Sequence, residues 1–460
     1  MDDRVEETGR EAVYLEKTAI KISDHFTYGK LLRYTVPPIV MMIFSSVYSV
    51  VDGLFVSNFA GKTPFAAINF IMPYLMILSA GGFMLGTGGN AYISKLLGEQ
   101  NREQARRIFS LVIYTTIIGG AVIIILGQLL LRPVAVLLGA EGELLDNAVL
   151  YGRIVLCGGI PFMLQMEFQS LFSTAGKPKL GLAITVAAGV SNIVLDALLI
   201  GVFKLGLIGA ATATTVSMSI GGIVPVLYFA LKRDGDLALI KTSFYGKALG
   251  KICTNGMSEM VTNISMSLVS MVFNAQLIRI AGEDGVAAYG VLMYVNMILL
   301  SAFIGYSMGT APIVGYNYGA KNTDELKSVF RKSLTLIAIF AVSMVVASYA
   351  LSVPLSKLFT GYDANLYSMT LNGFMIYSLS FLFAGVPIFG SSFFTALSNG
   401  KISATISFLR VLVFELLTVL ILPIFFGING IWWSIVLAEL LAAIVTAVFL
   451  AGNRRKYQYV

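Results

Sequence analysis

Long apolar runs that recur along almost the whole chain restrict its fold more than any other feature. A run of about 18 or more residues with few charges can cross a hydrocarbon core of about 30 Å as a helix. Of the 460 residues, 57% are hydrophobic and only 12% are charged, whereas soluble proteins carry about 25% charged residues. The runs also lack the alternation of a lipid-facing β-strand. We therefore expect an all-α polytopic membrane protein.

Polar breaks divide these runs into twelve expected transmembrane helices. The first six lie near 35–59, 66–97, 108–131, 147–171, 180–200 and 207–231. The second six lie near 252–281, 286–318, 333–359, 366–395, 401–426 and 428–451. Between the two sets, 232–251 is the longest internal polar stretch. We predict an N-terminal lobe at 1–231, a cytoplasmic linker at 232–251 and a C-terminal lobe at 252–460.

The two halves of the sequence repeat each other. A shift of 221 residues superposes glycines along both halves: Gly88 on Gly309, Gly98 on Gly319, Gly206 on Gly427 and Gly209 on Gly430. Near the start of each half, at Tyr28 and Tyr245, the shift is 217 residues. Because six spans separate the copies, both halves have the same orientation and are related by an axis along the membrane normal. This pattern predicts two pseudo-symmetric six-helix bundles, and transporters built from such repeats bind substrate near the midplane.

The net charge of +7 does not indicate a nucleic-acid partner, because the cations are concentrated in alternate loops. The cation-rich loops hold Lys95, Arg102, Arg106 and Arg107; Lys177 and Lys179; Lys232, Arg233, Lys241, Lys247 and Lys251; and Lys321, Lys327, Arg331 and Lys332. The intervening loops hold single cations. This alternation follows the positive-inside rule. It predicts a multi-pass protein of the cell membrane with both termini in the cytoplasm.

Residues that commonly carry metals, redox chemistry or catalysis are few. Cys157 and Cys253 lie in or beside apolar segments and form neither a disulfide framework nor a metal cluster. The single histidine, His25, precedes the first span, and the chain has no H-E-x-x-H or nucleophile-elbow motif. The first 30 residues have no apolar core of a signal peptide. We expect no enzyme activity, no cofactor and no cleavable signal peptide.

Two carboxylates, Asp52 and Asp196, interrupt otherwise uncharged apolar runs. An acid at the bilayer centre costs about 2.5–3.5 kcal/mol, so it usually faces a cavity and serves ion or proton movement. Asn192 precedes Asp196 by four residues and therefore lies on the same helix face. These oxygen ligands suit Na⁺, and a pair of adjacent carboxylates can instead bind protons as one coupled unit. The alternative is a structural hydrogen bond between helices.

The chain resembles the multidrug and toxic compound extrusion (MATE) family over essentially its whole length. The resemblance rests on the two six-span halves, on PPIVMMIFSSVYSVVDGLFVSNFAG in span one, on Asn192-x-x-x-Asp196 in span five, and on GLIGAATATT and GINGIWWSIVLAE in spans six and twelve. The two N-terminal acids make it similar to the DinF-like branch. The NorM-like branch carries acids on spans seven and ten, but span ten has none here and Glu259 comes too early in span seven.

The family resemblance implies further site residues. It adds Thr214 to the coupling cluster of Asp52, Asn192 and Asp196, and it places Tyr48 and Tyr151 along the adjacent cavity. Other roles stay open, because threonine in a membrane helix often bonds its own backbone and tyrosine often serves packing or the membrane interface.

Two prolines near the start of span one concern its shape. Pro38 lies far enough inside the span to bend the helix, whereas Pro37 is expected to help start it. In the family that the chain resembles, bending of this span has been linked to proton binding at the nearby acid. A simple helix start is the alternative.

The remaining charges within the spans are weaker candidates. Arg410 and Glu415, five residues apart in span eleven, are expected to form a structural pair. Glu259 is expected within two turns of a helix start and thus in water. Glu439 and Glu167 are assigned to cavity lining or packing.

These observations favour a secondary active antiporter that exports amphipathic or cationic organic compounds in exchange for H⁺ or Na⁺ by alternating access. We expect a monomer in a prokaryotic plasma membrane, with lipids and small molecules as partners and no nucleic acid. The alternative is a flippase for lipid-linked precursors from the same superfamily. Such flippases usually have fourteen spans and a strongly cationic cavity, which this sequence lacks. A membrane-embedded enzyme is disfavoured by the missing catalytic motifs.

Overall fold

The structure, a computed structural model, describes residues 20–56, 59, 62–233 and 235–460. These residues form helices joined by short connections, with no strand among them. Residues 1–19, where we expect no signal peptide, and the end of the first expected span at 57–58 lie outside the described residues.

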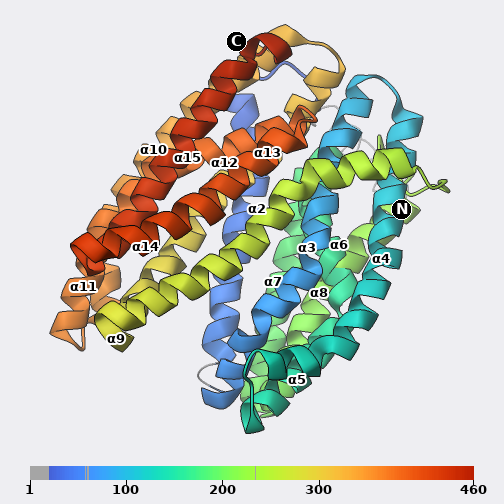
Figure 1. The fold of residues 1–460 in the computed structure, drawn as a ribbon. Helices are drawn as coiled ribbons and strands as arrows, with labels where there is room; N and C mark the ends of the chain where they lie inside the picture. Colours follow the sequence, from blue (N-terminus) through green and yellow to red (C-terminus); the bar gives the residue numbers. More distant parts are fainter. Residues whose placement is uncertain (1–19, 57–58, 60–61, 234) are drawn as a thin grey trace, which may run out of the picture.

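The helices of the N-terminal lobe are coloured from blue to green in Figure 1. Its helices are α2 (Tyr28–Phe55), α3 (Lys62–Gly98), α4 (Arg102–Leu137), α5 (Gly142–Cys157), α6 (Gly159–Thr174), α7 (Pro178–Asp196) with the π-helix η2 (Ala197–Val202), and α8 (Gly206–Leu231). The span expected at 147–171 is bent, since α5 and α6 meet at 61°. The sequence Gly158-Gly159 weakens the helix there, and Pro161 lacks a backbone donor.

The C-terminal lobe follows the same plan. Its helices are α9 (Gly246–Gly319), α10 (Thr323–Thr360), α11 (Ala364–Tyr377), η3 (Ser378–Ser380), α12 (Phe381–Ala396), α13 (Gly400–Ser407), the π-helix η4 (Phe408–Phe414), α14 (Glu415–Phe426) and α15 (Ile428–Tyr457). The 74 residues of α9 would make a helix about 110 Å long. Its direction changes at Gly282, where φ is 61° and ψ is −148°. This backbone conformation suits glycine, and it divides α9 into two spans.

The number of spans agrees with the sequence. Among the described residues, ten helical segments and the bent pair α5–α6 are long and apolar enough to cross a membrane. Because α9 contributes two crossings, these segments form the twelve expected spans. Lipid-facing side chains follow helical spacing, as on α4, where Ile118 and Leu129 are each 69% exposed and lie on one apolar stripe with Val122 and Ile125.

Two helix starts differ from the prediction. The hydroxyl of Thr27 accepts a hydrogen bond from Lys30 N and caps α2, so Pro37 and Pro38 both lie inside the helix. The expectation that Pro37 helps start the helix is therefore wrong, because a cap is already present ten residues earlier. Similarly, α9 begins at Gly246, so Glu259 lies more than three turns from the helix start and not within two.

The connection between the lobes packs along the N-terminal lobe. Leu239 N donates to Phe229 O at 2.9 Å, and Ile240 N donates to Ser110 Oγ at 2.9 Å. The Arg106 guanidinium donates to the backbone oxygen of Gly235 at 2.5 Å. The extended part of the linker is thus shorter than 232–251 and is fixed on α4 and α8.

Backbones of the two lobes touch where α3 crosses the first half of α9. A Cβ at Gly88 would lie 2.0 Å from Ile252 O, and one at Gly256 would lie 1.8 Å from Met84 O. Only glycine permits such an approach, as in other close membrane helix pairs.

The repeat generates a second crossing of the same kind, between α2 and the second half of α9. A Cβ at Gly309 would lie 3.1 Å from the side chain of Thr35, and one at Gly305 would lie 2.6 Å from Ile39 Cα. The shifts of 221 and 217 residues place Gly88 on Gly309 and Thr35 on Ile252. The lobe interface is therefore pseudo-symmetric at the level of single residues.

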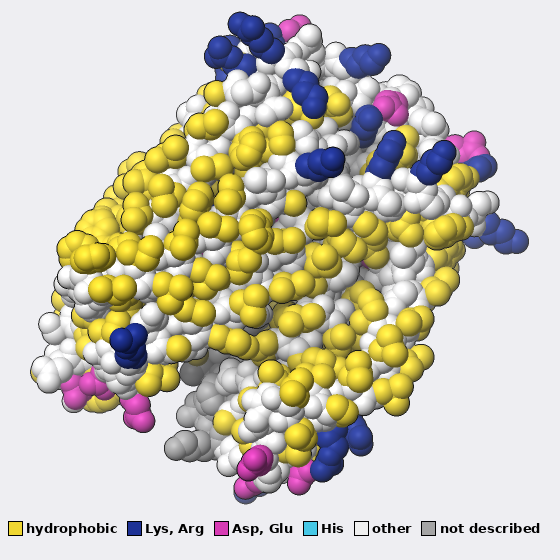
Figure 2. Space-filling view, viewed as in Figure 1, with side chains coloured by type: hydrophobic (Ala, Val, Ile, Leu, Met, Phe, Trp, Pro, Cys, Tyr) yellow, Lys and Arg dark blue, Asp and Glu magenta, His cyan; other side chains and the backbone are white. Residues whose placement is uncertain are grey.

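The lobes also meet at the end of the molecule where Lys and Arg side chains gather (Figure 2). A Cβ at Gly98 would lie 2.0 Å from Tyr316 O, and one at Gly319 would lie 2.1 Å from Lys95 O. Gln100 Nε2 donates to Tyr316 Oη at 3.0 Å across the same contact. The lobes are thus closed against each other at this cation-rich end.

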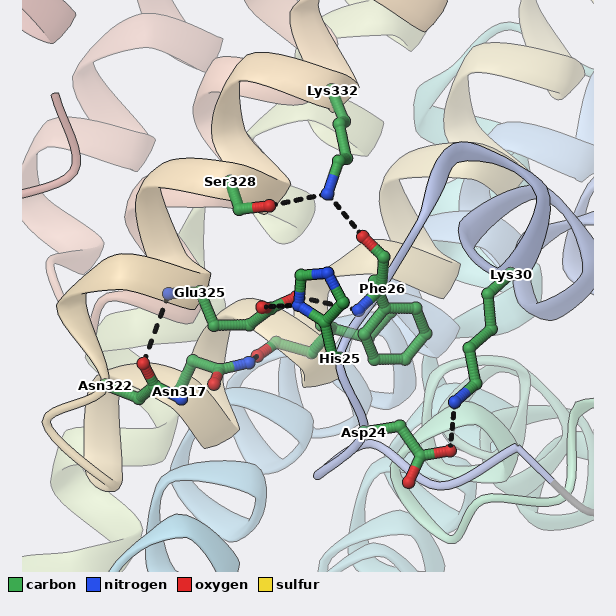
Figure 3. Close-up of polar contacts among 10 residues, drawn as sticks. Asp24, His25, Phe26, Lys30, Asn317, Asn322, Glu325, Ser328 and Lys332 are labelled. Carbon is green, nitrogen blue, oxygen red and sulfur yellow. Dashed lines mark hydrogen bonds and ion pairs between the residues drawn. The ribbon is translucent and has the colours of Figure 1, made fainter.

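The segment that precedes α2, residues 20–27, crosses to the C-terminal lobe and is here called the N-terminal strap (Figure 3). Glu325, in the first turn of α10, accepts a hydrogen bond from Phe26 N at 2.8 Å and contacts His25 Nδ1 at 2.6 Å. Lys332 Nζ donates to Phe26 O at 2.5 Å. The Phe26 ring is fully buried and packs edge-on against Tyr34. The strap therefore ties the first helix of one lobe to α10 of the other.

Candidate cation-coupling site and interlobe cavity

The predicted coupling residues of span five lie in the last two turns of α7. Asn192 and Asp196 are 1% and 0% exposed, and their four-residue spacing places them on one helix face. Directly after Asp196 the chain forms the π-helix η2. Such π-helical turns frequently occur at functional sites.

Asp52, from α2, contacts the side chains of both Asp196 and Asn192. Four oxygens of this cluster are buried and have no hydrogen-bond donor among the described residues: Asp52 Oδ1, Asn192 Oδ1, Asp196 Oδ1 and Asp196 Oδ2. Two ionised carboxylates are both acceptors, so neither can satisfy the other. The cluster therefore suits a shared proton or a small cation that oxygen atoms coordinate.

The cluster opens onto a cavity of about 140 Å³ inside the N-terminal lobe. Its walls include Tyr48, Ser49, Asp52, Met72, Ser79, Tyr151, Gln165, Asn192, Thr214 and Ser217. Pockets for drug-sized ligands measure about 300–1,000 Å³. This space is therefore better matched to water and a small ion than to an organic substrate.

The residues assigned through the family resemblance lie around the same cavity. Thr214 Oγ1 donates to Ala210 O at 3.0 Å, as in the backbone-bonded alternative, and it also contacts Tyr151. Tyr151 is 1% exposed and lies within electrostatic range of both acids. Tyr48 contacts Gln165. Thr214 thus lies beside the acid cluster with its hydroxyl proton already donated.

Gln165 is a site residue that the sequence analysis missed. It is 4% exposed on α6, its Nε2 has no acceptor among the described residues, and its side chain fills the space beside Gly221. The sequence does show an amide side chain within an apolar run at this position. Such an amide indicates a functional site less strongly than an acid does.

A second cavity, of about 180 Å³, lies between the lobes and is here called the interlobe cavity. Residues of α2, α3 and α6 form one side, and residues of α9, α12, α13 and η4 form the other. Its apolar wall includes Met42, Phe83, Met266, Ile304, Met308 and Ile388. Two of its lining residues, Glu259 and Arg410, are ionisable, and many of the others carry hydroxyl or amide groups.

Arg410 is paired with a different acid from the one expected. Its Nε lies 3.0 Å from both carboxylate oxygens of Glu439 on α15, and its Nη2 lies 2.7 Å from Glu439 Oε1. Glu415 is within electrostatic range of this pair but forms no ion pair with Arg410 among the described residues. Arg410 lies in the π-helix η4 and not in a regular α-helix, and its guanidinium reaches Glu439 on α15, so the expected Arg410–Glu415 pair is wrong.

Glu167 borders neither of the two cavities. It is fully buried and accepts a hydrogen bond from Thr116 Oγ1. A Cβ at Gly86 would lie 2.7 Å from Glu167 Cα, so α3 and α6 are in backbone contact at this point. Of the two roles expected for Glu167, packing fits this position.

Comparison with known proteins agrees with the repeat. The family model MatE matches the chain twice, at residues 37–198 and 259–421, and the two matches together cover more than half of the chain. The chain is 25% identical over 454 residues to the multidrug export protein MepA of Staphylococcus saprophyticus, with 96% of each chain covered. It is also 25% identical over 451 residues to MepA of Staphylococcus aureus, with the same coverage.

Solved structures show the same fold. One is described as the outward-facing conformation of a multidrug resistance MATE family transporter of the MOP superfamily. The TM-score is 0.89 at 22% identity, and the match covers 95% of this chain and 98% of that one. A MOP superfamily transporter from Pyrococcus furiosus, whose binding pocket is described as having reverse polarity, matches with a TM-score of 0.87, 22% identity and the same coverage.

Proposed function

The chain belongs to the MatE family, and we propose that it is a secondary active antiporter that exports amphipathic, cationic organic compounds in exchange for H⁺ or Na⁺. The full-length similarity to multidrug export proteins supports the export of drugs. The choice of antiport and of these coupling ions rests on the chemistry of the two cavities.

The buried acid cluster of Asp52, Asn192 and Asp196 carries this proposal. Three of the four carboxylate oxygens of Asp52 and Asp196 have no donor among the described residues, which is costly inside a membrane lobe unless the acids bind a cation in part of the cycle. A proton shared between Asp52 and Asp196 removes one charge. A Na⁺ ion would use the same carboxylate and amide oxygens.

The cluster is connected to the lobe interface through α2. Asp52 lies near one end of α2, whereas Ser46 Oγ contacts Ser301 Oγ of α9 at 2.5 Å and Thr35 packs at Gly309. Cation binding that draws Asp52 toward Asp196 therefore acts on a helix that also holds the other lobe. A ligand shifts a conformational equilibrium only by its different affinities for the two states. Cation and substrate would favour different arrangements of α2.

The interlobe cavity is the proposed substrate site. At about 180 Å³ it is also smaller than a pocket for a drug-sized ligand, but both lobes supply its walls, so it would widen when the lobes separate. Its methionines can adapt to different apolar shapes, and Glu259 offers a carboxylate to an organic cation. Both cavities lie within one chain, which supports a monomer as the functional unit.

We place the cation-rich end in the cytoplasm of a prokaryotic cell. The positive-inside rule supports this orientation, and so do the bacterial relatives. Both termini would then be cytoplasmic. The closed contact of Gly98 and Gly319 would seal the cytoplasmic side, so the structure would correspond to an outward-facing state.

The flippase alternative is less well supported. A lipid-linked pyrophosphate requires several cations, and Arg410 is the one cation among the described residues that line the interlobe cavity. Two of its three guanidinium nitrogens already donate to Glu439, so the donors that remain are too few for a pyrophosphate.

Export of ethidium by reconstituted protein tests the proposal. We expect Asp196→Asn and Asp52→Asn each to lower the rate of gradient-driven export at least tenfold, while Asp146→Asn, a change of an exposed acid in the second turn of α5, leaves it unchanged. Imposing a pH gradient and a Na⁺ gradient separately identifies the coupling ion. Full export by either cluster variant would refute the coupling role of the acids.

A further inference from the structure

The interlobe cavity carries charges of both signs on the C-terminal lobe. Arg410 and Glu259 both line it and lie within electrostatic range of each other. Arg410 comes from η4 and Glu259 from the first half of α9. Glu259 has no ion pair among the described residues.

The pairing of Arg410 leaves part of its guanidinium unused. Nε and Nη2 donate to Glu439, and within the described part of the chain Arg410 has no other hydrogen-bond acceptor. Nη1 carries two further donors, and the Arg410 side chain is 14% exposed. Glu439 thus fixes the position of the guanidinium, and a planar guanidinium held in this way suits a carboxylate.

From this arrangement we propose that the interlobe cavity selects zwitterionic amphiphiles, with Arg410 binding the carboxylate of the substrate and Glu259 binding its cationic group. Glu439 is a positioning residue for Arg410. The apolar side chains around the two charges would contact the ring system that joins them. This inference rests on the proposed export function and adds a second charged group to its substrate class.

A matched pair of dyes tests the selection. Tetramethylrhodamine is a zwitterion, whereas its methyl ester is a cation of nearly the same shape. Fluorescence polarisation with the purified full-length protein gives a dissociation constant for each dye. We expect the wild type to bind the zwitterion about tenfold more tightly than the ester, because the carboxylate gains hydrogen bonds to a charged donor.

Three changes separate the roles of the residues. Arg410→Gln combined with Glu439→Gln removes the cation without leaving an unpaired acid, and we expect it to abolish the tenfold preference by weakening zwitterion binding alone. Glu439→Gln alone keeps a side-chain oxygen that positions Arg410 but removes a competing negative charge, so the preference should increase. Glu259→Gln should weaken the binding of both dyes. Lys401→Gln removes an exposed cation at the start of the span that contains Arg410, and it should weaken the binding of neither dye.

Equal affinity of the wild type for both dyes would overturn the inference. A double variant that retains the preference for the zwitterion, or whose affinity for both dyes falls equally, would overturn it too. An unchanged or reduced preference in Glu439→Gln would also contradict it. The proposed export function is tested separately, since gradient-driven export of the ester would still be observed if only the selection of zwitterions failed.

Discussion

At the scale of single residues, the proposed ion-binding role of Asn192 can be tested against that of Thr214, which lies beside the acid cluster. The Asn192 oxygen has no donor among the described residues, whereas the Thr214 hydroxyl donates to its own helix. We expect Asn192→Leu to reduce gradient-driven ethidium export about tenfold or more, because one ligand oxygen is lost beside two buried acids. Thr214→Val, which has nearly the same shape, should leave export within about twofold. Initial rates in proteoliposomes compare the two variants, and the reverse order would mean that Thr214 binds the ion.

The same cluster predicts how substrate binding depends on pH if H⁺ is the coupling ion. In the proposed antiport, protonation of the Asp52–Asp196 pair would favour the state that releases substrate, so substrate affinity should rise as the pH is raised. The double change Asp52→Asn and Asp196→Asn fixes the cluster in an uncharged form and should make the affinity independent of pH. Fluorescence polarisation of ethidium between pH 6 and pH 9 measures this dependence. A pH dependence that persists in the double variant would assign it to other groups.

At the scale of the elements, the N-terminal strap should stabilise the closed cation-rich end. Glu325 accepts from Phe26 N and contacts His25, and hydrogen bonds to a charged group contribute about 1.5–3 kcal/mol each. We expect Glu325→Gln to lower the thermal unfolding midpoint and to expose the strap to limited proteolysis. Asp324→Asn is the matched control, because it removes an acid from the same first turn of α10 without a strap contact. If both changes lowered the unfolding midpoint equally, the loss of stability would come from the interaction of an acid with the helix dipole and not from the strap.

The elements also show what the sequence could and could not predict. Hydropathy alone located the twelve spans, since each must satisfy its backbone within the membrane. The spacing of Asn192 and Asp196 predicted their common face. The Arg410–Glu439 pair joins helices 29 residues apart in sequence, and helical periodicity carries no information about such contacts. The sequence could not predict the strap contact either, because His25 and Glu325 are 300 residues apart. Polar side chains are also common at the ends of spans, so these two residues did not attract attention.

At the scale of the whole molecule, the repeat explains why a two-state movement is available. The same backbone contact occurs twice, once as α3 against the first half of α9 and once as α2 against its second half. In the proposed transport cycle, two lobes that meet through related glycine crossings would rock against each other about an axis in the membrane plane, and both crossings would change together. The third contact, at Gly98 and Gly319, lies at the cation-rich end, and the proposed alternating access would require it to open.

This contact gives a prediction for the whole molecule. In Gly319→Ala the added Cβ would lie 2.1 Å from Lys95 O, a backbone atom on α3 that cannot rotate away. Overpacking of this kind costs about 1–3 kcal/mol, and 1.4 kcal/mol changes an equilibrium tenfold. We expect the population to shift toward the state that is open at the cation-rich end. Distances between spin labels at Lys179 and Lys401, in a background without Cys157 and Cys253, would lengthen in a growing fraction of molecules.

A second glycine change makes this measurement specific to the lobe contact. Gly119 lies inside α4 with no atom within 4 Å of an added Cβ, so Gly119→Ala tests the general effect of a more rigid helix and should leave the distance distribution unchanged. If Gly319→Ala gives the same distribution as Gly119→Ala, the close approach of α3 and α9 does not set the balance between the two states. If only Gly319→Ala lengthens the distances, the rate of substrate export should fall as well, because a cycle requires both states and the sealed one has become rare.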